Sequence, residues 1–259
     1  MKHALFFLFT LTVLLFSTGC TKESDKDNPT PELSAFNLQF DLSYQGQPLV
    51  MFEPYSLNDS VRVLFSRFSM YLTDIELINS EGSTVSLEEL GFYNLTDQFM
   101  DEVSAAEGYS LNFPDLEPGT FSGLRFGLGL PQALNVQQPG DFEPGHPLNA
   151  PEEYWIGWQS YVFVKIEGKI DADSNPNEFE RNMALHLGGD EIFRQVQLNE
   201  PFVLNSGSST TLVINIDLYD MFSPEGSTSY DLLDRPMIHS TSHLPQANEL
   251  IDNLVGTIQ

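Results

Sequence analysis

Short runs of alternating apolar and polar residues, separated by turn signals, dominate the chain after about residue 35. Residues 36–42 alternate cleanly, and residues 161–168 form the most strand-like stretch of all. Strands are also expected at residues 61–65, 69–78, 84–87, 91–95, 110–113, 123–130, 183–187, 195–198, 202–204 and 211–218. Many short strands without long intervening helices predict an all-β fold, an antiparallel β-sandwich of the immunoglobulin-like type.

Two segments depart from this pattern. Residues 131–154 are rich in Pro, Gly and Asn, and a loop of that length in a compact domain is usually functional or disordered. The tail after Pro245 has apolar residues at helical spacing, which predicts a short amphipathic C-terminal helix. The residues that set this spacing are Ala247, Leu250, Ile251, Leu254 and Val255.

The N-terminus is typical of a secretion signal. A basic start at Lys2 precedes an apolar run over residues 4–16, which is short for a transmembrane helix, and small residues follow. Cys20 comes directly after Gly19, as in bacterial lipoprotein signals, although an ordinary secretory signal with an incidental Cys is the alternative. We therefore expect a signal peptide over residues 1–19, lipidation at Cys20, a flexible acidic tether over 20–34 and a single β-sandwich domain over 35–259. The mature protein would be exported and lipid-anchored to a bacterial membrane, the outer membrane being expected, on its periplasmic or surface face.

Composition narrows the function classes. The formal net charge of −26, from 37 acidic and 11 basic residues, argues against nucleic acid or an anionic membrane surface as a partner. The single cysteine is Cys20, so the domain has no intramolecular disulfide, no Cys nucleophile and no Cys-ligated metal site. No hydrolase, P-loop or dinucleotide-binding motif is present, and we expect a protein that is not an enzyme.

Four histidines remain once the signal peptide is removed. His186 stands in an apolar strand, where a single His is more often a satisfied core residue than a ligand. His146 lies in the long loop, where surface exposure is the commoner outcome, and His239 and His243 are four residues apart without a helical pattern. Spacing alone is therefore weak evidence for a metal.

Two further features have both structural and functional interpretations. Trp155 and Trp158 are the only tryptophans and, on periodicity alone, belong to an aromatic core entering a strand. Residues 171–178 look like the start of a calcium loop, but Pro176 and Asn182 occupy the positions that require Gly and Glu. A polar hairpin loop is the better interpretation of that segment.

Taken together, several segments resemble the MbnP-like family of exported β-sandwich proteins. They are residues 71–77, Gly82, 92–97, 123–131, 146–148, 155–161, 167–168, 186–189 and 216–218, and the resemblance spans about residues 36–222. It implies copper binding through histidines and a tryptophan-derived kynurenine, which is made by a partner di-haem peroxidase-like enzyme of the MbnH type.

Carried over to this chain, the resemblance makes Trp155 or Trp158 the modified residue and His186 a candidate copper ligand. His146, His239 and His243 compete for the remaining positions. Copper-binding members carry an Asn-His pair after the Gly-Leu-Pro segment, whereas this chain has Asn135 followed by Val136. The expected function is a copper-binding lipoprotein in metal acquisition or handling; the alternative is a metal-free surface interaction module on the same sandwich.

Overall fold

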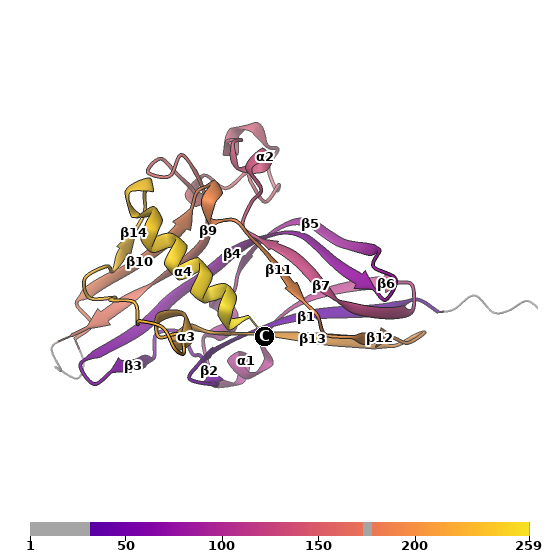
Figure 1. Cartoon of the computed structure of the whole chain (residues 1–259), viewed down its shortest axis with the longest axis horizontal. Helices are drawn as coiled ribbons and strands as arrows, with labels where there is room; N and C mark the ends of the chain where they lie inside the picture. Colours follow the sequence, from indigo (N-terminus) through magenta and orange to yellow (C-terminus); the bar gives the residue numbers. More distant parts are fainter. Residues whose placement is uncertain (1–31, 173–177, 259) are drawn as a thin grey trace, which may run out of the picture. The chain divides into compact units, whose positions relative to one another are not determined.

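The computed structural model describes residues 32–172 and 178–258, so the expected signal peptide, Cys20 and most of the expected tether lie outside the described residues. Within this part, strands form two main sheets (Figure 1). The smaller sheet consists of β1 (Ser34–Tyr44), β2 (Gln47–Pro48), β6 (Tyr109–Leu116) and β13 (Ser209–Asp217). The larger sheet runs β11 (Arg194–Leu198), β7 (Gly119–Leu128), β4 (Val61–Asn79), β9 (Ser160–Asp171), β10 (Arg181–Gly188) and β14 (Met237–Ile238). Attached to it are β3 (Pro54–Asn58), β5 (Thr84–Asn94) and β12 (Phe202–Leu204), while β8 (Tyr154–Trp155) pairs with β9.

The prediction of an all-β sandwich is confirmed, with two additions to the expected strand pairing. Most neighbouring strands are antiparallel, but β1 pairs with β13 and β10 pairs with β14 in parallel. These pairs join strands far apart in the sequence, so no hairpin turn constrains their direction. Phe36 of the smaller sheet stacks on Phe202 of the larger one at 5.3 Å between ring centroids, and apolar side chains of this kind fill the space between the sheets.

Two pairs of expected strands are in fact single strands. Residues 61–65 and 69–78 belong to one strand, β4, whose register against β9 shifts between Phe65 and Arg67. The gap between the two expected strands is therefore a local irregularity of the β-bulge type within one continuous strand. In the same way, residues 84–87 and 91–95 belong almost entirely to β5.

The C-terminal helix is present as α4 (Leu244–Thr257), close to the expected bounds. It buries the predicted apolar face against β10, β11 and β13. The other helices are short: α1 (Glu102–Glu107), α2 (Gln132–Asn135), α3 (Leu218–Phe222) and the 3₁₀ turns Thr96–Phe99, Pro139–Asp141, Pro151–Glu153, Asp190–Ile192 and Thr241–His243. Within the described ranges, none of the helices is both long and apolar enough to cross a membrane.

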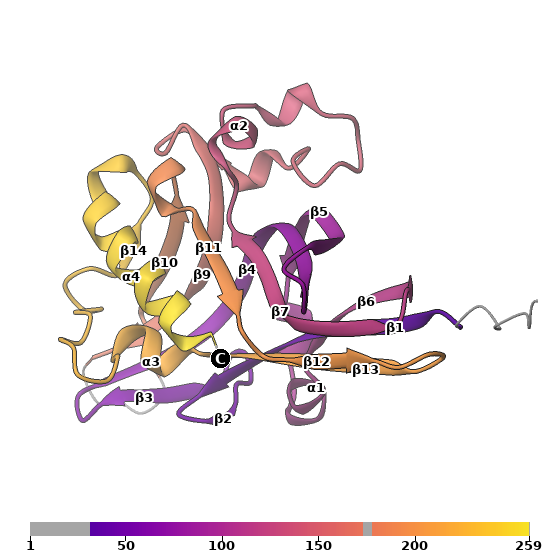
Figure 2. The ribbon, with the colours of Figure 1, turned by 45° about the vertical axis from the view of Figure 1, so that its right-hand side comes forward.

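The long segment between β7 and β8 is folded against the larger sheet. Figures 1 and 2 show it, with α2, gathered at one end of that sheet. The phenol of Tyr71 donates a hydrogen bond to the Pro147 carbonyl at 3.1 Å, and Tyr161 donates to the Leu148 carbonyl at 2.7 Å. Leu148 itself is fully buried. These contacts hold the segment in place and bring β8 alongside β9.

Candidate functional site: a histidine–tryptophan cluster

Four of the predicted site residues lie together at one end of the larger sheet: His186, His239, His243 and Trp155, here called the His–Trp cluster. His186 lies near the end of β10, and only 4% of its side chain is exposed. Trp155 reaches it from β8, which pairs with β9 through Trp155 and Ser160. The Trp155 ring meets the His186 ring edge to face, with centroids 4.4 Å apart.

His239 reaches the cluster because β14 adds to β10 in parallel. Ile238 is opposite Leu185 in this pairing, so the next residues along the two strands are His239 and His186. Their ring centroids are 5.9 Å apart, and the His239 ring is stacked on Trp155 at 5.8 Å with an interplanar angle of 11°.

A close backbone contact supports this arrangement from the other side. The amide of Thr241 donates a hydrogen bond to the Gly157 carbonyl at 3.2 Å. A Cβ atom at Gly157 would lie 2.4 Å from the His239 carbonyl oxygen, so only glycine permits this approach. The turn between Trp155 and Trp158 is thus fixed against the segment that carries His239.

His243 completes the cluster at the start of α4. Its ring centroid is 5.9 Å from that of His239, and its Nδ1 atom lies 3.4 Å from the His239 amide and 3.3 Å from the Ser240 hydroxyl. Because Nδ1 is engaged with these local donors, Nε2 is the nitrogen of His243 that remains for another partner.

Two ring nitrogens of the cluster are buried without a hydrogen-bond partner. They are Nδ1 of His186 and Nδ1 of His239. Burial lowers the pKa of His239 below its ordinary value, and a proton on His186 or His243 would lower it further. A neutral imidazole with a bare nitrogen is the form that binds metals. The cluster therefore presents two buried nitrogens with no partner within the described structure.

The opposite nitrogen of His186, Nε2, lies 2.8 Å from Oε1 of Glu167 on β9. The hydrogen bond from His186 lowers the pKa of the Glu167 carboxyl against the opposing effect of burial, and the positive charges of Arg67 and Lys165 lower it further. Glu167 is therefore an ionised acceptor at the edge of the cluster.

Trp158 has a different position from Trp155. It is 4% exposed, and its indole Nε1 donates to the backbone carbonyl of His186 at 2.8 Å. A Cβ atom at Gly188 would lie 3.2 Å from the Trp158 ring, and Gly189 has a φ of +97°. Gly188 and Gly189, which follow Leu187, thus leave room for the indole of Trp158. The hydrogen bond of this indole to the His186 carbonyl fixes the backbone beneath the cluster.

A buried ion network lies next to the cluster. Glu153, two residues before Trp155, contacts Arg67 of β4 through Oε1 at 2.6 Å and Lys165 of β9 through Oε2 at 2.5 Å. The side chains of Glu153 and Lys165 are 1% and 5% exposed. Lys165 also donates to the Glu152 carbonyl at 3.1 Å, so the network ties the start of β8 to the sheet.

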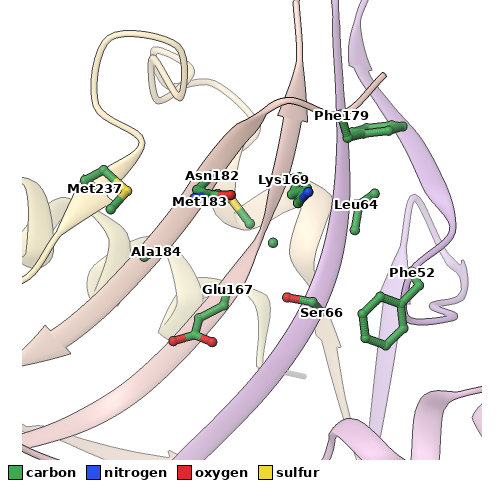
Figure 3. A pocket seen from close by; sticks show the side chains of 11 residues that line it. Phe52, Leu64, Ser66, Glu167, Lys169, Phe179, Asn182, Met183, Ala184 and Met237 are labelled. Carbon is green, nitrogen blue, oxygen red and sulfur yellow. The ribbon is translucent and has the colours of Figure 1, made fainter. Parts of the chain in front are cut away.

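A pocket of about 710 Å³ opens beside Glu167 on β9 (Figure 3). It is lined by Phe52, Leu64, Ser66, Glu167, Gly168, Lys169, Phe179, Asn182, Met183, Ala184 and Met237. Glu167, 36% exposed, thus joins the pocket to His186.

Glu167, Glu153 and Lys165 were not among the site residues predicted from the sequence. The sequence did contain a signal for Lys165 and Glu167. They stand inside the most apolar strand, and Lys and Glu are rarely buried unless they are paired.

His146 is placed apart from these interactions. Its exposed ring stacks on Phe142 at 4.3 Å between centroids, and its Nδ1 accepts a hydrogen bond from the Leu148 amide at 3.1 Å. Both partners belong to its own loop.

Asn135 is buried, donates to Asp190 at 2.7 Å and accepts from the Tyr161 amide, while Val136 is 67% exposed. Across residues 32–172 and 178–258, no group of three or more His, Cys, Asp or Glu side chains is arranged to hold a metal ion.

Comparison with known proteins places this architecture. No curated protein matches the chain. The solved structure of MbnP from Methylosinus trichosporium is similar, with a TM-score of 0.50 and 13% identity, over 77% of this chain and 80% of that chain. At this identity the similarity concerns the fold alone. The family model described as MbnP matches residues 33–240, which is most of the sequence, and the chain therefore belongs to the MbnP family.

Proposed function

We propose that this protein is an exported lipoprotein that binds copper at the His–Trp cluster and serves in metal acquisition or handling, without catalysing a reaction itself. The observation that carries the proposal is the pair of buried, unpartnered nitrogens, Nδ1 of His186 and Nδ1 of His239. A buried polar atom without a partner is costly, and a metal ion bound between these two rings, whose centroids are 5.9 Å apart, would supply the missing partner. Imidazole nitrogen is a ligand that suits copper.

The cluster also favours Trp155 over Trp158 as the oxidised residue. Trp155 is half-buried and contacts both His186 and His239, whereas the indole N–H of Trp158 already donates a hydrogen bond to the backbone carbonyl of His186. The nitrogen of an intact indole is a donor only and offers no lone pair to a metal. A kynurenine at Trp155 would supply an aryl amine beside the two imidazoles, and His243 could add a further nitrogen through Nε2. Because that amine comes from a tryptophan, the proposal does not require three His, Cys, Asp or Glu ligands.

Copper titration of histidine variants tests this assignment. The Cys20→Ala chain is the suitable background, because it lacks the only thiol. We expect His186→Ala and His239→Ala to lose most of the copper affinity. His146→Ala is the matched control and should titrate like the parent, because its ring interacts only within its own loop. Equal stoichiometry and affinity for His186→Ala and the parent would reject the copper assignment and favour a metal-free interaction module.

The oxidised tryptophan requires a partner, for which we propose a di-haem peroxidase-like enzyme of the MbnH type. Co-expression with such an enzyme, followed by peptide mass mapping, should show the modification at Trp155 and leave Trp158 as tryptophan. A modification found on Trp158 alone would contradict the choice that the geometry favours.

The lipid anchor is the remaining part of the proposal. Labelling cells with a tagged fatty acid should mark the wild-type chain, and Cys20→Ala should lose the label and leave the membrane fraction or remain as precursor. Unchanged labelling of Cys20→Ala would exclude lipidation at this residue.

A further inference from the structure

Glu167 lies where it can decide which nitrogen of His186 carries the proton. Its Oε1 atom is 2.8 Å from Nε2 of His186. An ionised carboxylate only accepts hydrogen bonds, so the ring nitrogen that faces it must be the protonated one. In a neutral imidazole the other nitrogen is then bare, and that nitrogen, Nδ1, is buried without a partner.

We propose that Glu167 is a positioning residue that holds His186 in the Nε2–H tautomer and thereby presents Nδ1 to copper. The first half of this proposal concerns the metal-free protein, and the second half rests on the copper-binding function proposed above. Histidines that bind metals commonly donate their other ring N–H to a carboxylate, which fixes both the tautomer and the orientation of the ring.

The opposite tautomer is disfavoured by the same contact. It would set the lone pair of Nε2 against the carboxylate oxygen at 2.8 Å and would leave a buried N–H at Nδ1 unpaired. Each of these costs free energy, and the loss of a hydrogen bond to a charged group exceeds that of a neutral one.

The surroundings keep Glu167 in this position. It is paired with Ala184 of β10 on one side and with Arg67 of β4 on the other, so its backbone belongs to the centre of the sheet. Figure 3 shows its carboxylate at one end of the pocket, where 36% of the side chain is exposed. One oxygen can thus bind His186 while the carboxylate stays solvated enough to remain ionised.

Nitrogen-15 NMR of the histidine rings tests the tautomer without any metal. On the metal-free Cys20→Ala chain at about pH 8, where imidazoles are neutral, we expect His186 to show a protonated Nε2 that exchanges slowly and a bare Nδ1. Glu167→Ala should lose the slow exchange and shift both ring nitrogens toward a tautomer mixture. Glu167→Leu fills a similar volume without offering a hydrogen-bond acceptor, and serves if the alanine variant does not fold. A proton on Nδ1 in the parent, or unchanged His186 ring nitrogens in the variants, would overturn the proposal.

Copper affinity tests the second half. Loss of such a carboxylate lowers metal affinity by about 10–100-fold, and we expect this of Glu167→Ala. Glu180→Gln is the control: it removes one acidic charge at an exposed position near the start of β10 and should leave affinity unchanged. Equal affinity in Glu167→Ala and the parent would refute the positioning role while copper binding stands. A parent that shows the expected tautomer but binds no copper even after co-expression with the di-haem enzyme would refute the copper-binding function, and only the tautomer assignment would stand.

Discussion

Replacing Glu153 with Gln would leave the ammonium group of Lys165 buried without its carboxylate partner. The two side chains are 1% and 5% exposed and their charged atoms are 2.5 Å apart, so water cannot easily replace the lost contact. Removing one partner of a buried ion pair costs about 3–5 kcal/mol. The second partner of Glu153, Arg67, is 28% exposed and can turn toward solvent, so its lost contact adds at most about 1 kcal/mol.

The neighbouring carboxylate of Glu167 already interacts with the charge of Lys165, so we expect a cost for Glu153→Gln at the lower end of this range, about 3 kcal/mol. In urea, with a denaturant slope of about 2.5 kcal/mol per M for a domain of this size, the unfolding midpoint should fall by about 1 M. Glu152→Gln is the matched control, since this neighbouring carboxylate is exposed, and its change should stay within about 0.5 kcal/mol.

A double variant separates the buried charge from other effects of the substitution. Adding Lys165→Met to Glu153→Gln removes the uncompensated ammonium group, so much of the lost stability should return. A loss below about 1 kcal/mol for Glu153→Gln alone, or a double variant less stable than the single one, would refute the reasoning.

Three further outcomes follow from the cluster. Trp158→Phe removes the indole donor to the His186 carbonyl and should cost about 1 kcal/mol in thermal unfolding, whereas no loss would show that this carbonyl finds another donor. Gly188→Ala would place a Cβ atom 2.7 Å from the Tyr161 carbonyl oxygen, and we expect a loss of about 1–3 kcal/mol in urea unfolding, which an unchanged midpoint would contradict. Burial lowers the pKa of His239 in the folded protein below its ordinary 6.5, so His239 takes up a proton first in the unfolded chain as the pH falls. The contribution of neutral His239 to the free energy of unfolding is therefore complete above about pH 6.5 and declines below it. His239→Asn should flatten this part of the pH dependence of the urea midpoint, and an identical slope in both proteins would contradict the assignment.

The strands could largely be predicted because their signal is local. Residues 36–42 alternate along the whole of their length, and the structure extends them to β1 (Ser34–Tyr44). The apolar spacing after Pro245 likewise gave the helix to within two residues at its C-terminal end. Where the prediction divided β4, the cause was a bulge at Phe65–Arg67, whose polar residues resemble a turn in the sequence although the strand continues through them.

The convergence of the candidate residues had no comparable signal. His239 lies beside His186 only because β14, two residues long, pairs in parallel with β10 more than 50 residues earlier in the chain. A strand of two residues has no periodicity to detect, and parallel pairing gives no turn signature. The resemblance to a family supplied six candidate residues, and only three-dimensional contacts show that four of them lie together. His146 and Trp158 have partners of their own in the structure.

The one local signal for the network around the cluster was in the most apolar strand. Lys165 and Glu167 interrupt a run that otherwise predicts a strand buried on both faces, and both side chains point to the face that carries His186. A buried Lys requires a carboxylate, so Lys165 predicts an acidic partner. A carboxylate in the same strand requires a hydrogen-bond donor, and a buried imidazole needs an acceptor for its N–H, so Glu167 predicts a partner of this complementary type. The partners are Glu153, which lies just before β8, and His186 on β10. The same two contacts therefore fix the entry of β8 with Trp155 and the orientation of His186, which makes this polar face of β9 the element that sets the geometry of the cluster.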